Sequence, residues 1–344
     1  MRTPTRVSFA FMAGGLVLVG WLNLTVLLLT GLFGYFALEK LAIGGRKWVA
    51  LLLFVVVLGA AGYGFVAFAR AAVAALPRIA EESIPRIIAF ADSRGVELPE
   101  GYNYDTLKAD ALAFVRGKLG SVGRYAGDSL RAVVAFLVGI VVSVSLFFNT
   151  RIEPDADPVT GRDNMYSQSF LEVVARFRTF YQSFKTVMGA QIVISLINAS
   201  ITSVFLVWNS FPYAPVLAGL TFLLGLLPIV GNLLSNALIV SVGFTLSPQM
   251  AFLALAYLVI IHKLEYFLNS KIIGDRIRNP MWLTLLGLLV GEKLMGVPGM
   301  ILAPPLLHYV KVEASRHRLA APTGPDQPGP GLDPGGSGES RVTA

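Results

Sequence analysis

The longest run of residues without a charged or histidine side chain is the feature that most restricts the fold. Residues 186–261 contain no Asp, Glu, Lys, Arg or His. A soluble domain of this length would need charged side chains on its hydrated surface, so the composition fits hydrocarbon rather than water. At a rise of about 1.5 Å per helical residue and a bilayer core of roughly 30 Å, this run is long enough for about three crossings.

Shorter charge-free runs occur along the rest of the chain. They comprise residues 7–38, 48–69, 132–150, 279–291 and 294–307. The 344 residues are 55% hydrophobic and 14% charged, whereas soluble proteins carry about 25% charged residues. The sequence therefore predicts an all-α, polytopic integral membrane protein of about eight transmembrane helices. These include broken or re-entrant helices, and amphipathic surface helices are expected in addition.

Basic residues follow a pattern that indicates orientation in a membrane. The formal net charge is +7, and the cations lie beside the hydrophobic runs instead of forming one patch that could bind nucleic acid. They are Arg2, Arg6, Lys40, Arg46, Lys47, Arg176, Arg178, Lys185, Lys271, Arg276, Arg278, Lys311, Arg316 and Arg318. Because basic loops stay in the cytoplasm and an even number of spans is expected, both termini should be cytoplasmic.

Composition divides the chain into six segments. We predict N-terminal transmembrane helices (residues 1–76), an amphipathic extramembrane helical region (77–131), a transmembrane helix (132–150), a cytoplasmic loop with an amphipathic helix (151–185), a C-terminal transmembrane core (186–312) and a disordered tail (319–344). The first segment should contain two short helices that meet near residues 21–23 and a third helix that Pro77 ends. A small soluble bundle is an equally good interpretation of residues 77–131.

Two interruptions of apolar segments are candidates for functional sites. One contains Pro228 and Gly231, and the other spans residues 291–299 and contains Pro298 and Gly299. An unpaired backbone amide or carbonyl costs several kcal/mol in hydrocarbon, so such breaks are tolerated only where protein or a water-filled cavity covers them. Because broken helices form binding sites in transporters, we predict that the two breaks lie at one depth and line one cavity. A plain kink or a tight turn is the structural alternative.

Uncharged polar residues inside the apolar runs have two interpretations. Gln191 and Asn198 are best explained by hydrogen bonds between helices. Asn232, Ser235 and Asn236 directly follow the first break. Asn232 is the better candidate for substrate contact, because it could cap a half-helix beside free backbone groups.

Glu265 is the first carboxylate after the long charge-free run. It follows His262 by three residues, so both side chains share one face of the predicted helix. A titratable pair at that depth could carry protons if transport is coupled to protons or sodium. The alternative is an interfacial ion pair between Glu265 and one of three cations, Lys263, Lys271 or Arg276.

The sequence lacks the motifs of several enzyme classes. There is no G-x-x-x-x-G-K-[ST] phosphate loop, no H-E-x-x-H zinc helix and no G-x-S-x-G nucleophile turn, so ATP-driven pumping and intramembrane proteolysis lose support. The chain has no cysteine and only three histidines, His262, His308 and His317. We therefore expect a protein that is not an enzyme and has no cofactor and no metal site.

Four motifs occur in order within residues 191–311. They are Leu227-Pro228-Ile229-Val230-Gly231, the stretch from Glu265 through Lys271 to Gly274, the dipeptide Asn279-Pro280, and the glycine-rich stretch from Leu288 to Pro304. As an ordered set they resemble the AI-2E family of bacterial membrane proteins, the autoinducer-2 exporter family that is also called PerM-like permeases. Four residues depart from the common pattern, namely Asn232 and Ser270 in place of proline, Asn279 in place of histidine and Glu292 in place of a small residue.

The resemblance implies a multi-pass transporter in the bacterial inner membrane that moves a small polar solute or signalling molecule such as autoinducer-2. A sodium (lithium)/proton antiporter is the alternative within the family, and a non-transporting membrane scaffold is the alternative outside it. Expected partners are membrane lipid, the solute or ion, and copies of the same chain, for whose packing Gly287-x-x-x-Gly291 is available. The candidate pathway comprises Pro228, Gly231, Asn232, Asn236, Glu265, Asn269, Gly274, Glu292, Gly296, Pro298 and Gly299.

Overall fold

The computed structural model describes residues 3–96, 103–122, 129–149, 153–154, 161, 163–227, 230–273 and 280–316. Its elements are helices, which confirms the predicted all-α class. They are α1 (Thr3–Trp21), α2 (Thr25–Leu41), the short 3-10 helix η1 (Ile43–Gly45), α3 (Lys47–Ser93), α4 (Tyr104–Val122), α5 (Ser129–Phe148), α6 (Met165–Trp208), α7 (Ala214–Gly225), α8 (Val230–Leu246), α9 (Pro248–Ile273) and α10 (Met281–Arg316). The predicted disordered tail, residues 319–344, lies outside the described residues.

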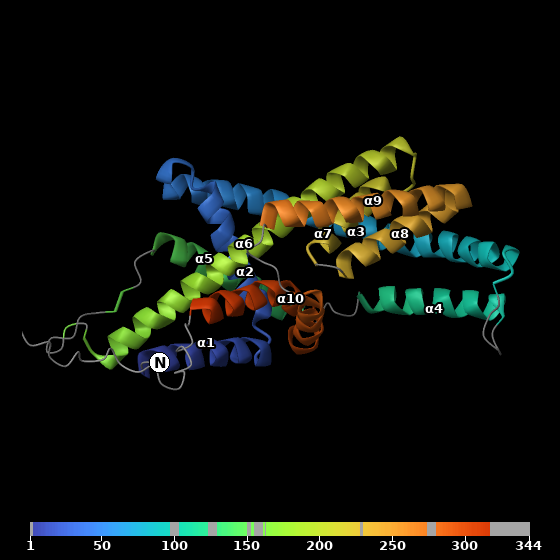
Figure 1. Ribbon diagram of the computed structural model, residues 1–344. Coiled ribbons are helices and arrows are strands. Elements are labelled where there is room, and N and C mark those ends of the chain that lie inside the picture. Colours follow the sequence, from blue (N-terminus) through green and yellow to red (C-terminus); the bar gives the residue numbers. More distant parts are fainter. Residues whose placement is uncertain are drawn as a thin grey trace, which may run out of the picture.

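The first two helices meet where the sequence predicts. Between α1 and α2, Asn23 has a φ angle of 55°, in the left-handed region. A right-handed helix ends at such a residue because the next helical turn cannot form. The two helices then separate, since α1 packs mainly against α6 whereas α2 packs mainly against α5. The long α6 therefore lies between elements that are far apart in sequence (Figure 1).

The prediction that Pro77 ends the third helix is wrong. Helix α3 runs for 47 residues and contains both Pro77 and Pro85. A proline inside a helix costs about 3 kcal/mol because it removes one hydrogen bond and crowds the preceding turn, but tertiary contacts offset this cost. Beyond Pro77, Ile79 and Ser83 are almost fully buried, and Arg86 donates to the carbonyl of Thr245 in α8.

Helix α3 is too long to lie wholly within a bilayer. At about 1.5 Å per residue its 47 residues extend roughly 70 Å, more than twice the hydrocarbon thickness. Its second half packs against α4, and Figure 1 shows the two helices side by side at the right of the molecule. The predicted extramembrane region thus continues a transmembrane helix directly instead of starting as a separate unit.

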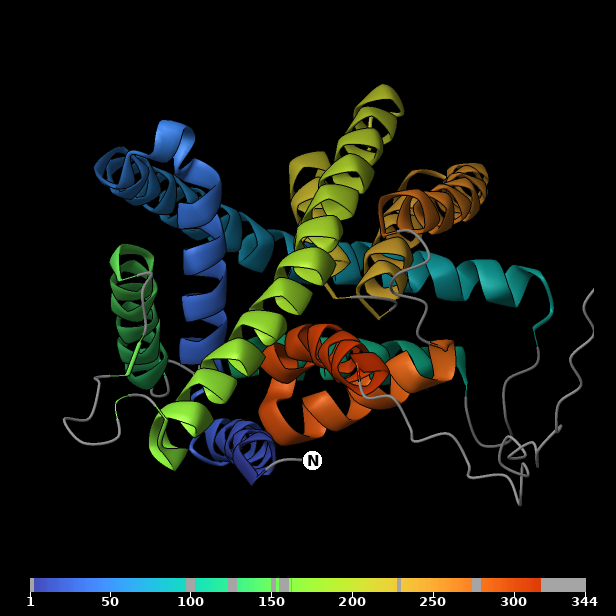
Figure 2. The same cartoon turned by 60° about the vertical axis from the view of Figure 1, so that its left-hand side comes forward.

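Helix α6 joins two segments that the sequence analysis separated. It runs for 44 residues, starting after Asn164, whose side chain accepts a hydrogen bond from the Ser167 amide. The expected amphipathic helix before residue 186 and the apolar helix after it are therefore one element. Figure 2 shows α6 crossing the molecule diagonally, with α10 near its lower half and α7 near its upper half.

Helices α7 and α8 form a short hairpin. A turn in which Ser210 and Tyr213 have positive φ angles precedes α7, which ends at Gly225, and α8 begins at Val230. The predicted break is therefore present, although Pro228 itself lies outside the described residues. The 12 residues of α7 rise only about 18 Å, less than the roughly 30 Å of a bilayer core. The α7–α8 hairpin is thus re-entrant in form.

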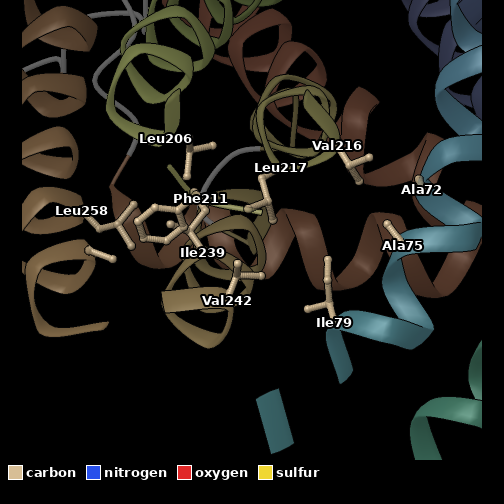
Figure 3. Close-up of a cluster of buried hydrophobic side chains, with 11 residues drawn as sticks. Ala72, Ala75, Ile79, Leu206, Phe211, Val216, Leu217, Ile239, Val242 and Leu258 are labelled. Carbon is tan, nitrogen blue, oxygen red and sulfur yellow. The ribbon is translucent and has the colours of Figure 1, made fainter. Parts of the chain in front are cut away.

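The largest buried apolar cluster fixes this hairpin to its neighbours. Figure 3 shows side chains from α3, α6, α7, α8 and α9 meeting in one core, together with Phe211 from the turn before α7. The labelled residues are Ala72, Ala75, Ile79, Leu206, Phe211, Val216, Leu217, Ile239, Val242 and Leu258. Because five helices contribute, the hairpin is held between α6, α9 and the C-terminal half of α3.

Helix α10 is a second hairpin, folded at one glycine. Gly296 has φ 63° and ψ −153°, a conformation that is essentially restricted to glycine. A Cβ atom on Gly287 would lie 3.8 Å from Cβ of Ala303, whereas a straight helix would separate these residues by about 24 Å. Figure 2 shows the two arms folded together. The break predicted within residues 291–299 is therefore present, at Gly296, whereas residues 291–293 are helical.

Four continuous described helices have the length and apolar composition to cross a membrane, namely α1, α3, α5 and α6. Helix α10 meets the same criteria over its whole length but is folded at Gly296, and α7 and α8 are shorter apolar helices. The arms of the α10 hairpin pack through Gly287 and Gly291, because the latter's Cβ position lies 2.6 Å from the Gly299 carbonyl oxygen. The G-x-x-x-G motif therefore serves packing within the chain. Both the expected total of about eight spans and the homo-oligomer stay predictions.

Candidate functional site

The tip of the α7–α8 hairpin is bound to α6 by polar contacts. The Gln191 side-chain amide in α6 donates a 2.5 Å hydrogen bond to the carbonyl oxygen of Gly225, the last residue of α7. Terminal carbonyls of a helix lack partners within that helix, and hydrocarbon offers none. The predicted role of Gln191 in bonding between helices is confirmed.

A close backbone approach explains the glycine at the start of α8. Any side chain at Gly231 would overlap the carbonyl group of Leu224 in the last turn of α7. The two half-helices therefore meet at van der Waals distance, and only glycine fits. This contact fixes the direction in which the next residue, Asn232, leaves the tip.

Asn232 and Glu265 form the central pair of the candidate site. The Asn232 amide nitrogen lies 2.6 Å from both carboxylate oxygens of Glu265 in α9, and Glu265 is 8% exposed. The prediction that Asn232 caps its own half-helix is wrong, because α8 begins at Val230 and Asn232 lies inside it. The hydrogen bonds of this pair therefore join the hairpin tip to α9.

The ionic alternative for Glu265 gains no support among the residues whose side chains are described. Lys263 is exposed, and no ion pair joins it to Glu265. The side chains of Lys271 and Arg276 lie outside the described set. A buried carboxylate that is satisfied by a neutral amide can take up a proton or exchange this amide for a donor on a solute.

Both helix breaks are attached to α6. Gln191 contacts the α7–α8 tip. Met295, which directly precedes the Gly296 turn of α10, packs against the buried cluster that includes Phe180, Phe184 and Met188 of α6. That the two breaks lie at one depth stays a prediction.

No direct contact between the two breaks is found in the described part of the chain. Helix α8 packs mainly against α9, α7 and α3, whereas α10 packs mainly against α6 and α2. In Figure 1, α10 lies with α1 below α6, and α8 lies with α9 on the other side. The predicted cavity between the two breaks stays a prediction.

The remaining candidate residues fall into three groups. Asn236 is half-buried one turn after Asn232 and belongs to the same site. Glu292, Gly296, Pro298 and Gly299 lie in the α10 hairpin, with Glu292 exposed. Pro228 and Gly274 lie outside the described residues, as does the side chain of Asn269.

Sequence reasoning missed half of a polar face on α6. Ser195 and Thr202 lie on the same helical face as Gln191 and Asn198, and all four are buried. Ser195 lies against the tip, with its oxygen 2.8 Å from the Cβ position of Gly225. Thr202 accepts a 3.2 Å hydrogen bond from the Tyr257 hydroxyl of α9. The spacing of four, three and four residues inside an apolar run was the available signal.

A buried ion cluster was also missed. Arg176 of α6, one of the cations that mark the predicted orientation, is buried and pairs with Glu313 of α10. Its guanidinium also donates a 3.4 Å hydrogen bond to Ser8 of α1 and lies 4.0 Å from the ring centre of Phe9. The partners are more than a hundred residues away in sequence, so local periodicity could not reveal them. The cluster fixes α1 and α10 to the N-terminal half of α6.

Among the described residues, no group of three or more His, Asp and Glu side chains could hold a metal ion. Polar side chains at broken helices inside an apolar bundle are typical of membrane transport proteins, and this is the class that fold and site define. The chain belongs to the AI-2E family of transporters, because the model of that family matches residues 7–315. The match includes the N-terminal half, which carries none of the four motifs.

Two proteins of Bacillus subtilis (strain 168) are similar to parts of the chain. Putative transport protein YdbI is 29% identical over 144 residues, which are 41% of this chain and 41% of YdbI. Putative transport protein YueF is 38% identical over 102 residues, which are 29% of this chain and 27% of YueF. The matched segments thus cover less than half the length of each relative.

Proposed function

We propose that this protein exports a small polar solute or signalling molecule of the autoinducer-2 kind across the bacterial inner membrane, without catalysing a reaction. The path would pass the junction of α6, α9 and the α7–α8 hairpin. One observation carries the proposal: Asn232 at the hairpin tip donates to both oxygens of the buried Glu265. A solute whose hydroxyl groups replace this donor would couple its own binding to movement of the tip.

The surroundings of the pair support a pathway rather than packing alone. Burial of an ionisable side chain among apolar helices is costly, and such residues commonly mark solute or ion paths. Gln191 of α6 and Asn236 of α8 add uncharged hydrogen-bonding groups to the elements that form the junction. Membrane lipid would surround the bundle, and an assembly of identical chains remains part of the proposal.

Exchange of sodium or lithium for protons is the second candidate function. The same Glu265 favours it, because a buried carboxylate whose described hydrogen-bond donor is the neutral Asn232 amide can bind a proton on one side of the membrane and release it on the other. In this case a change of pH inside vesicles would accompany sodium uptake. Solute export and cation exchange thus predict different measured quantities.

Purified protein in lipid vesicles tests both candidates. Vesicles preloaded with isotopically labelled autoinducer-2 should lose label faster than protein-free vesicles if solute transport is correct. A pH-sensitive dye in parallel vesicles reports proton movement after sodium addition. If a folded protein supports neither flux, the non-transporting scaffold is favoured and the proposed function is rejected.

A further inference from the structure

The four buried residues of the polar face of α6 fall into an outer pair and an inner pair. Gln191 and Thr202 at its ends are hydrogen-bonded, to the Gly225 carbonyl oxygen and to the Tyr257 hydroxyl respectively. Ser195 and Asn198 lie between them and are 1% and 4% exposed. Within the described residues, the Ser195 hydroxyl and the Asn198 side-chain carbonyl have no hydrogen-bond partner.

Unpaired polar atoms at this depth require an explanation. A buried oxygen without a hydrogen-bond partner costs about 1–3 kcal/mol. Apolar side chains at these two positions would avoid this cost. Serine in a helix usually bonds the carbonyl four residues earlier, as Ser200 does with Leu196. Ser195 instead lies against Gly225 of the hairpin tip. Its hydroxyl therefore faces the tip of the α7–α8 hairpin, which is the part proposed above to move.

We infer that Ser195 and Asn198 determine solute specificity by binding a neutral solute through its hydroxyl groups. The inference rests on the proposed function and names the solute chemistry of that site. Asn198 Oδ1 can only accept, so the solute must donate, and the Ser195 hydroxyl can donate or accept in return. The two residues are three apart in a helix, which places their Cβ atoms about 5–6 Å apart.

The charge of the surroundings favours a neutral solute over an ion. Residues 186–261 contain no Asp, Glu, Lys, Arg or His, so an ion bound at this face would find no opposite charge from α7, α8 or this part of α6. Both oxygens are covered by protein. A solute therefore reaches them only when the α7–α8 hairpin separates from α6, which also breaks the bond from Gln191 to Gly225.

The first test is the thermal stability of the purified protein. Replacing both unpaired groups in Ser195→Ala/Asn198→Leu should leave the melting temperature unchanged or raise it, since no hydrogen bond is lost. Gln191→Leu should melt about 2–4 °C lower, because it leaves the Gly225 carbonyl unpaired. Ser200→Ala, on the exposed side of α6, is the matched control for the serine. A double variant that melts as low as Gln191→Leu would show a structural role and overturn the inference.

The second test is binding of erythritol, a neutral solute with four hydroxyl groups, compared with its tetramethyl ether, which cannot donate. Erythritol should raise the melting temperature of the unaltered protein and of Ser200→Ala, and the double variant should need at least about tenfold more erythritol for the same shift. The ether should protect none of them. Equal protection of the unaltered protein and the double variant by erythritol would overturn the inference.

Flux measurements separate this inference from the proposed function. Selective erythritol binding by a protein that moves no solute would reject transport and retain the Ser195–Asn198 site. Autoinducer-2 flux that is the same in the unaltered protein and the double variant would retain transport and reject the site.

Discussion

Gly231 has the most restrictive backbone contact at the hairpin tip, because even a methyl group would overlap the Leu224 carbonyl. We predict that Gly231→Ala lowers the free energy of unfolding by about 1–3 kcal/mol through overpacking. Gly59→Ala is the control, since Gly59 is exposed in α3 with nothing within 4 Å of its Cβ position. Reversible unfolding in detergent measures both variants. Equal stability of Gly231→Ala and the unaltered protein would show that the tip is loosely packed.

The hydrogen bond between Asn232 and Glu265 can be measured by a double-mutant cycle. Asn232→Leu should destabilise the protein by about 1–3 kcal/mol, because a buried carboxylate loses its described donor. Asn232→Leu/Glu265→Leu should recover part of this loss, since two apolar side chains require no partner. Strictly additive effects of the two substitutions would contradict the contact.

The α10 hairpin is the element whose geometry differs most from a straight helix. Its Gly287 and Ala303 Cβ positions lie 3.8 Å apart, a separation typical of disulfide-bonded residues. Because the chain has no cysteine, Gly287→Cys/Ala303→Cys should lose both free thiols on mild oxidation. Ala190→Cys/Leu206→Cys has the same sequence separation in the continuous α6 and should keep both. Retained thiols in the first pair would mean that α10 does not fold back.

At the element scale, sequence patterns predicted helix ends well where the backbone itself must break. The meeting of α1 and α2 near Asn23 and the break before Gly231 were both predicted, because a left-handed residue or a close backbone contact leaves a local signature. Pro77 misled the prediction, since burial of Ile79 and Ser83 against α8 outweighs the local cost of proline. The turn of α10 at Gly296 falls within the predicted interruption, whereas residues 291–293 stay helical because Gly291 packs against Gly299 of the other arm.

On the scale of the whole molecule, the orientation follows from charge. Basic residues near Arg6, Lys40 and Lys311 favour a cytoplasmic position for both termini. A reporter that is active only in the cytoplasm should therefore be active when fused after residue 344, and a reporter that requires export should be silent there. Activity of the exported reporter would contradict the even number of spans.

The candidate site shows which features can be predicted from the sequence and which cannot. Glu265 and Asn232 were singled out as unusual residues in an apolar context, but their bond could not be predicted because it depends on how α8 packs against α9. The ion cluster around Arg176 was not predicted, since helical period alone cannot show that α1 and α10 cover this residue. Local chemistry thus identified the residues, and tertiary packing determined their partners.

The most direct test of the central claim is the autoinducer-2 flux of Glu265→Gln in lipid vesicles. Glutamine keeps the shape of the side chain but cannot bind and release a proton or carry charge. We predict folded, membrane-inserted protein whose flux falls at least about tenfold, the expected effect of losing one charged hydrogen-bonding group of roughly 1.5–3 kcal/mol. Asp110→Asn, on the exposed surface of α4, should transport as the unaltered protein does. Unchanged flux in Glu265→Gln would contradict a pathway at the hairpin tip and leave Glu265 with a role in packing alone.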